Sequence, residues 1–140
     1  MLPTILATFT YFFLPILAVP PPSEMFKQLV YPSGLYSNKD YPVDMLSCRH
    51  TLKKYKTLKD LPGYPFVGGA PLVNDEHEDG ANCASCWRVT YRGESSNFLL
   101  IDFADGGFRV PQAALRNLTG GAEPVRAEIH RTSREDCTYF

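Results

Sequence analysis

The 140-residue sequence lacks an excess of positive charge and has no long hydrophobic run after its first 18 residues. Lys and Arg number 14 against 15 Asp and Glu, for a net charge of −1, whereas nucleic-acid-binding proteins usually carry a basic excess. A mature chain without a further apolar run of about 18 residues is not expected to span a membrane. The length suits one domain, because domains usually have about 100–200 residues.

The N-terminal 18 residues, MLPTILATFTYFFLPILA, contain no Asp, Glu, Lys or Arg. An apolar stretch of this length that ends at a small residue, Ala18, is typical of a secretory signal peptide. We therefore predict a signal peptide over 1–18, a loose proline-rich tail over 19–27 and a single domain over 28–140. Secretion would place the mature chain outside the cell or in a cell wall.

The cysteines are even in number: Cys48, Cys83, Cys86 and Cys137. In a short secreted chain this count predicts two disulfides, and the spacing leaves all three connectivities open. The CxxC spacing of Cys83 and Cys86 also occurs in zinc and redox sites. A zinc ribbon needs a second close pair, and a redox motif opens a helix, whereas the residues after Cys86 alternate like a strand.

Proline and glycine are frequent, with 12 and 10 residues, which favours short strands and turns. The pattern predicts a hairpin of strands 87–92 and 97–103, with the apolar run 98–101 buried on both sides. It predicts one clear helix over 111–118 and a half-buried strand over 125–131. Several short strands with one helix indicate a small β-barrel or sandwich.

Three other segments carry weaker signals. Residues 28–36 look like short extended pieces broken by a turn, and the lysines between 53 and 59 are interpreted as a solvated face. The acidic cluster 75–79 matches no calcium-loop spacing and is expected to be an exposed loop. No catalytic triad or metal spacing includes any of the histidines, which are His50, His77 and His130.

Five motifs follow one another along the chain: LPGYPFVGGA at 61–70, NCASCW at 82–87, LIDFA at 100–104, Gly107-Phe108, and AALRNLT at 113–119. No single motif is specific, but their combination and order are. Together they make the sequence resemble the cerato-platanin family over residues 29–137. The chain departs from the family pattern at Tyr31-Pro32, where a Tyr-Asp pair is usual, and at 49–53, where a Gly-rich segment is usual.

The resemblance implies a mainly β fold, a six-stranded double-ψ β-barrel with short helices, related to expansins and barwin-like proteins. It implies disulfides Cys48–Cys83 and Cys86–Cys137. It further implies a secreted, monomeric fungal protein without cofactor or metal, which binds chitin or N-acetylglucosamine oligosaccharides. Such proteins loosen cellulose without evident hydrolysis and elicit plant defence, so a plant host is a possible partner. Fold analogy alone does not fix function.

Four residues are candidates for carbohydrate binding. Asp102, which ends a strand, matches the aspartate on the groove floor of expansin-like barrels; it would anchor sugar hydroxyls or hold the following turn. Tyr31 and Tyr64 flank turns and could offer flat faces to sugar rings. Asn82 could bond a sugar amide or cap the loop before the CxxC motif. Asp105 is interpreted as part of a turn.

Catalysis is the main alternative. Glycoside hydrolysis normally needs two carboxylates, and a weak hydrolase built on Asp102 would lack an evident second one. No catalytic residue is therefore predicted. A barwin-like protein acting on RNA would need a basic cleft, against which the near-neutral charge argues. Of the remaining features, Tyr36 is a further aromatic candidate, Trp87 is expected in the core, and Asn117 begins an N-glycosylation triplet.

Overall fold

The computed structural model describes residues 26–73 and 82–137. Six strands and two short α-helices make up its regular structure, with single 3-10 turns at Val43–Met45, Leu58–Asp60 and Arg134–Asp136. The strands are β1 (Phe26–Ser33), β2 (Val67–Ala70), β3 (Cys86–Tyr91), β4 (Glu94–Phe103), β5 (Phe108–Pro111) and β6 (Val125–Thr132); the helices are α1 (Gly34–Ser37) and α2 (Gln112–Thr119).

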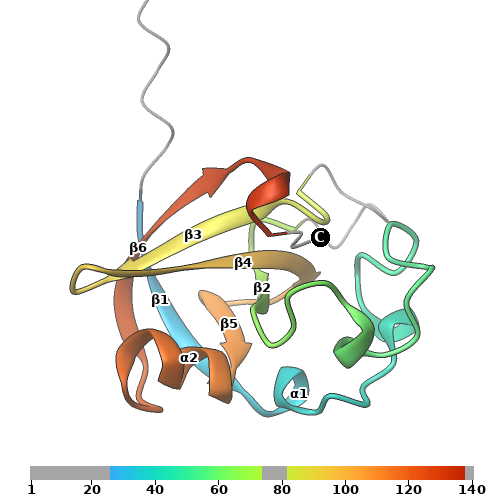
Figure 1. Cartoon of the computed structure of the whole chain (residues 1–140), viewed down its shortest axis with the longest axis horizontal. Coiled ribbons are helices and arrows are strands. Elements are labelled where there is room, and N and C mark those ends of the chain that lie inside the picture. Colours follow the sequence, from blue (N-terminus) through green and yellow to red (C-terminus); the bar gives the residue numbers. More distant parts are fainter. Residues whose placement is uncertain (1–25, 74–81, 138–140) are drawn as a thin grey trace, which may run out of the picture.

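The six strands close into a barrel in the order β1-β5-β2-β4-β3-β6. Two neighbouring pairs, β1 with β5 and β2 with β4, are parallel, and the other four are antiparallel. Closure pairs the backbone of every strand and leaves no free sheet edge. In Figure 1 the β3–β4 hairpin extends to one side, and α1 and α2 lie below the barrel. The predicted fold class, a six-stranded β-barrel with short helices, is confirmed.

The first strand is longer than expected. β1 runs without a break from Phe26, so Phe26 and Lys27 belong to the barrel and not to the predicted loose tail. The Phe26 ring packs edge-on against Trp87, with ring centroids 6.1 Å apart, and its backbone pairs with Ile129. In place of the turn expected within 28–36, β1 continues to Ser33 and α1 begins at Gly34, where the Ser33 side chain accepts from the Tyr36 N–H.

The predicted hairpin is confirmed, with a tighter turn than expected. Only Arg92 and Gly93 separate β3 from β4, and both have positive φ, at 48° and 80°. Two such residues make a turn whose twist matches that of the strands it joins. The four residues of the apolar run 98–101 in β4 are buried at 3% exposure or less, as predicted. Inside the barrel the rings of Phe98 and Phe108 meet edge to face at 5.9 Å.

The predicted helix is also confirmed. α2 begins one residue later than expected, because Pro111 precedes it as the N-cap. Ala114, Leu115 and Leu118 form its buried face, and the helix ends at Gly120, which is left-handed at φ 79°. Glycine adopts that conformation without the steric cost that a side chain would add.

Both disulfides are present, as Cys48–Cys83 and Cys86–Cys137, the pairing that the resemblance implied. The first ties an irregular segment, 38–66, to the barrel next to β4, where the Cys48 N–H donates to the Ile101 carbonyl at 3.3 Å. The lysine-rich part of that segment consists of turns, and its lysines are exposed, as predicted. The acidic cluster 75–79 lies outside the described residues. No helix in the described ranges combines the length and apolarity needed to cross a membrane.

Candidate functional site

Two of the four candidate residues, Tyr31 and Asp102, come together through the strand register. Tyr31 on β1 is the Cα partner of Arg109 on β5, Arg109 is the partner of Gly69 on β2, and Gly69 is the partner of Asp102 on β4. We call this line of four residues the site row. Its side chains lie on the outer face, since the neighbours of Arg109, Phe108 and Val110, are fully buried.

Asp102 is held by three hydrogen bonds from the chain itself. One carboxylate oxygen, Oδ1, accepts from the Ser47 backbone N–H at 2.7 Å and from the Ser47 hydroxyl at 2.8 Å. The other, Oδ2, accepts from the Tyr36 hydroxyl at 2.8 Å. The side chain therefore fixes the segment before Cys48 against β4. It is half-buried, and a carboxylate has about four acceptor positions, so its oxygens are not saturated.

Tyr36 lies directly over Gly69. A Cβ atom at position 69 would stand 2.2 Å from the Tyr36 hydroxyl oxygen, so only glycine allows this approach. Tyr36 is 3% exposed and therefore offers no face to a sugar ring; its role is to position Asp102. Burial raises the pKa of the Tyr36 phenol well above its ordinary value, and the adjacent Asp102 charge raises it further.

Tyr31 supports Arg109. The Arg109 guanidinium lies 4.7 Å from the centre of the Tyr31 ring, and its Nε donates to the Tyr31 hydroxyl. That hydroxyl donates in turn to the backbone carbonyl of Asp105. On the turn after β4, a Cβ at Gly107 would come within 3.1 Å of the Tyr31 ring. Arg109 and the backbone at Gly107 therefore cover the Tyr31 ring. Of the pair Tyr31 and Arg109, the exposed group is the Arg109 guanidinium. As expected, Asp105 takes part in a turn.

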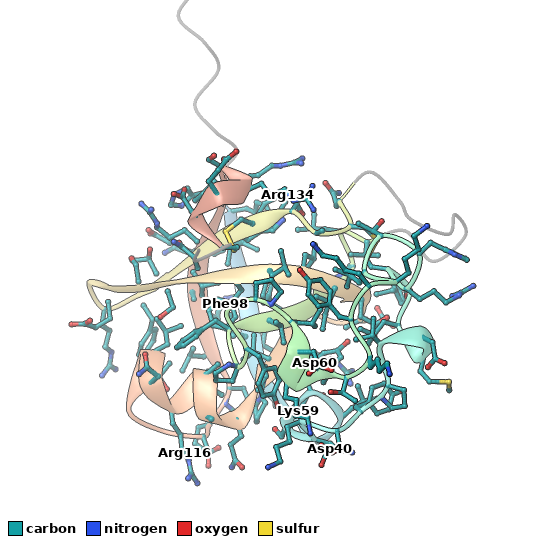
Figure 2. All side chains as sticks on the ribbon, turned by 45° about the vertical axis from the view of Figure 1, so that its right-hand side comes forward. Asp40, Lys59, Asp60, Phe98, Arg116 and Arg134 are labelled. Atoms are coloured by element: carbon teal, nitrogen blue, oxygen red, sulfur yellow. A yellow bond between two sulfur atoms is a disulfide. The ribbon has the colours of Figure 1, made fainter. Side chains whose placement is uncertain are left out.

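Tyr64 borders a shallow depression of about 420 Å³ beside α1 and α2. Its hydroxyl donates to the Tyr36 carbonyl at 2.8 Å, which connects this depression to the site row. Burial, followed by the charge of Asp40, raises the pKa of Tyr64. Figure 2 shows Asp40 beside Lys59, its ion-pair partner at 3.0 Å, and Arg116 projecting outward from α2. The depression is lined by Ser37, Lys39, Tyr64, Pro65, Pro111, Gln112, Ala113 and Arg116.

Asn82 does not join this group. Its amide nitrogen donates to the Leu72 carbonyl at 2.8 Å, and its amide oxygen accepts from Arg131 at 3.3 Å. None of its hydrogen bonds reaches the site row. Its backbone carbonyl accepts from the Ser85 hydroxyl, so Asn82 serves the loop before the CxxC motif, the second of the two roles considered for it.

Two residues of this region were missed from the sequence. Arg109 lies in a four-residue strand that is too short to show a pattern. Ser47 carried no signal of its own, because its role depends on the contact between two segments 55 residues apart. Tyr36 was considered only as a stacking surface, a role that its burial excludes.

The remaining expectations concern metals, the core and modification. Within 26–73 and 82–137, no group of three or more His, Cys, Asp or Glu side chains could hold a metal ion. Trp87 is buried, as predicted, and its indole N–H donates to the Ser85 hydroxyl at 2.8 Å. Asn117 is exposed on α2.

The cerato-platanin family model matches residues 31–138, and the chain therefore belongs to the cerato-platanin family. Cerato-platanin from Ceratocystis fimbriata f. sp. platani is 36% identical over 78 residues, which cover 55% of this chain and 57% of that protein. A heat-stable 19 kDa antigen of Coccidioides posadasii is 30% identical over 105 residues, which cover 71% of this chain and 70% of the antigen. The match thus spans little more than half of the Ceratocystis protein.

Solved structures agree on the fold. The crystal structure of cerato-platanin 2 from M. perniciosa has a TM-score of 0.74 at 21% identity, covering 81% of this chain and 100% of that one. The solution structure of the fungal elicitor cerato-platanin has a TM-score of 0.69 at 27% identity, covering 78% of this chain and 95% of that one. Together with the closed barrel and both disulfides, these likenesses identify the fold as that of cerato-platanins.

Proposed function

We propose that this protein binds chitin-type oligosaccharides of N-acetylglucosamine at the site row and does not cleave them. The observation that carries the proposal is the Tyr36–Asp102 hydrogen bond over Gly69, which presents a preoriented carboxylate on the outer face of a rigid barrel. Half-buried acceptors with positions to spare can receive bonds from sugar hydroxyls at little cost in ordering.

Arg109 and Tyr64 supply the other contacts. The guanidinium of Arg109 has donors for hydroxyl and acetamide oxygens, and Tyr31 holds it in place from below. Tyr64, together with Pro65, offers apolar surface in the adjoining depression, on which a sugar ring can lie. The site is thus built from fixed polar groups on the barrel and an apolar surface beside it.

The surroundings of Asp102 support binding without cleavage. A general acid has to donate a proton to the leaving oxygen, whereas Asp102 faces three donors and acts as an acceptor. Hydrolysis would also need a second carboxylate at a defined separation. The nearest in sequence, Asp105, is exposed and belongs to the turn after β4. A weak hydrolase that uses Asp102 is the alternative that the test below distinguishes.

The proposal also covers location and biological role. We infer that the protein is secreted or lies in the fungal cell wall, loosens cellulose and elicits plant defence. The predicted signal peptide and the two disulfides support secretion, because disulfides persist in oxidising compartments. Elicitation is supported by the name of one similar structure, the fungal elicitor cerato-platanin. A monomer that needs no cofactor remains the expected form.

The test is an NMR titration of the isotopically labelled mature chain with chitin and cellulose oligomers, with released reducing ends assayed in the same samples. We expect saturable shifts at Arg109, Asp102 and Tyr64 and no reducing ends. Arg109→Gln should weaken binding about tenfold, by loss of charge-assisted hydrogen bonds. Arg126→Gln, an exposed arginine on β6, is the matched control and should bind as the parent chain does.

Two results would contradict the proposal. Reducing ends that disappear in Asp102→Asn would establish a hydrolase. Saturable binding that is equal in the parent chain and in Arg109→Gln would place the oligosaccharide elsewhere on the molecule.

A further inference from the structure

A second depression lies on a different part of the barrel, across β1, β6 and the β3–β4 turn. Its volume is about 420 Å³, and it shares no lining residue with the depression at Tyr64. Three of its residues are cationic and one is acidic, so its local charge is +3 − 1 = +2 in a chain whose net charge is −1. The lining residues are Lys27, Thr90, Tyr91, Arg92, Gly93, Arg126, Ala127 and Glu128. We call it the cationic depression.

The strand register explains why these charges gather. Lys27 on β1 and Thr90 on β3 are both Cα partners of Glu128 on β6, so the three residues form one line across the sheet. Arg126 lies two residues from Glu128 on the same strand and therefore on the same face. The residue between them, Ala127, is 3% exposed and points into the barrel.

The cations are exposed and available. In the two described ranges, no ion pair forms at Lys27, Arg92 or Arg126. The guanidinium of Arg92 rests 5.1 Å from the centre of the Tyr91 ring, an arrangement that leaves its donors directed at solvent or a ligand. Unpaired charges gathered at one place attract a ligand of opposite sign and raise its association rate.

Arg92 also occupies an unusual backbone position. Its φ of 48° is left-handed, at a turn position where Asn, Asp or Gly is strongly preferred. A long side chain in this conformation carries a steric cost that asparagine largely avoids. The hairpin would thus form more easily with another residue, and a ligand contact accounts for an arginine at the rim of the depression.

We propose that the cationic depression binds an acidic oligosaccharide whose sugar units carry carboxylates, such as an oligogalacturonate. Guanidinium groups match carboxylates in bidentate geometry, which accounts for Arg92 and Arg126. Glu128 repels any anion placed directly against it, so the ligand needs a hydroxyl group at that point, which Glu128 and Thr90 can bond. A ligand with both carboxylates and hydroxyls satisfies the whole set. This inference does not depend on the site row.

The test compares three probes with the mature chain by titration: oligogalacturonate, the same oligomer with its carboxylates methyl-esterified, and a single-stranded oligonucleotide. Oligogalacturonate should bind saturably and shift the signals of Lys27, Arg92, Arg126 and Thr90. The methyl ester should bind at least tenfold more weakly. Raising the salt from about 0.05 M to about 0.2 M should weaken binding about tenfold, because roughly two counterions are released.

Substitutions test whether oligogalacturonate binds at the cationic depression. Arg92→Asn keeps a residue suited to the turn and should weaken oligogalacturonate binding about fivefold, as should Arg126→Gln. Lys53→Gln removes an exposed cation from the irregular segment and is the charge-matched control, expected to bind like the parent chain. Equal binding of oligogalacturonate and its methyl ester would overturn the proposal. So would an oligonucleotide that binds as tightly, or an equal loss of affinity in Lys53→Gln.

Discussion

The site row and the cationic depression lie on the same barrel but differ in how their polar groups are used. In the site row, Asp102 and Arg109 are already bonded to Ser47, Tyr36 and Tyr31. In the cationic depression, the charges have no ion-pair partner among the described residues. Preoriented groups select a ligand by geometry, whereas free charges attract it in a salt-dependent way. The two proposals therefore assign neutral and acidic sugars to separate faces of one barrel.

Removal of the Cys48–Cys83 disulfide should have the largest effect on stability. Of the two proposed sites, it should impair only the site row. The bridge closes a loop of 35 residues, and the chain-entropy model assigns it about 4 kcal/mol. Ser47, next to Cys48, would lose its fixed position at Asp102. We expect Cys48→Ser/Cys83→Ser to lower the free energy of unfolding in urea and to abolish binding of chitin oligomers.

The matched control is Cys86→Ser/Cys137→Ser. This bridge closes a loop of 51 residues and does not involve the neighbour of Ser47. Its loss of stability should be similar, and under conditions where it remains folded it should still bind chitin oligomers. Equal loss of sugar binding in both double variants would show that the bridge does not act through Ser47.

Gly69→Ala should be the next largest in effect. The added methyl group would collide with the Tyr36 hydroxyl at 2.2 Å, and overpacking of this kind typically costs about 1–3 kcal/mol. It should separate Tyr36 from Asp102 and weaken chitin binding, while oligogalacturonate binding stays unchanged. Thermal and urea unfolding measure the first effect. Gly121→Ala, with no atom within 4 Å of the new methyl group, should change stability by less than about 0.5 kcal/mol.

Alkaline pH should lower the free energy of unfolding, because Tyr36 in the fold must stay protonated. Because burial raises its phenol pKa in the fold, the unfolded chain loses this proton first, near the ordinary value of 10.0. The contribution to stability is therefore complete below about pH 10 and falls above it, by up to about 1.4 kcal/mol per pH unit. Urea unfolding between about pH 8 and about pH 11 measures the slope. Tyr36→Phe should remove much of it, leaving the parts due to Tyr64 and Lys59, whose pKa values are also raised; an unchanged slope would contradict the burial of Tyr36.

Arg92→Asn should have the smallest effect on stability, and of opposite sign. Relief of the left-handed arginine should stabilise the hairpin by at most about 1 kcal/mol, while acidic sugar binding falls. Arg126→Gln, in regular strand backbone, should leave the free energy of unfolding within about 0.5 kcal/mol of the parent. A destabilised Arg92→Asn would show that Arg92 contributes to the fold.

Individual strands and helices could be predicted from the sequence better than the contacts between them. The apolar run of β4 and the apolar face of α2 have periods that local reasoning can read. The site row depends instead on the parallel pairing of β1 with β5 and on a register shift between Gly68 and Gly69, which brings Gly69 opposite Asp102. Neither leaves a local signal.

The same reason separates the candidate residues. Asp102 and Tyr31 could be named as candidates from the sequence because they lie at a strand end and beside a turn. Arg109 and Ser47 could not, because they act through partners 78 and 55 residues away. Asn82 was a candidate for the same chemistry, but its side chain bonds Leu72 and Arg131 and makes no hydrogen bond to the site row. Long-range register therefore decides which polar residues share a site.

The most direct test of the two-face account is a crossed titration. Arg109→Gln and Arg126→Gln, both exposed arginines on the barrel, are each titrated with a chitin oligomer and with oligogalacturonate. The account predicts that Arg109→Gln loses about tenfold in affinity for the chitin oligomer alone, and that Arg126→Gln loses about fivefold for oligogalacturonate alone. Both ligands losing affinity in the same variant would contradict it, because one surface would then serve both.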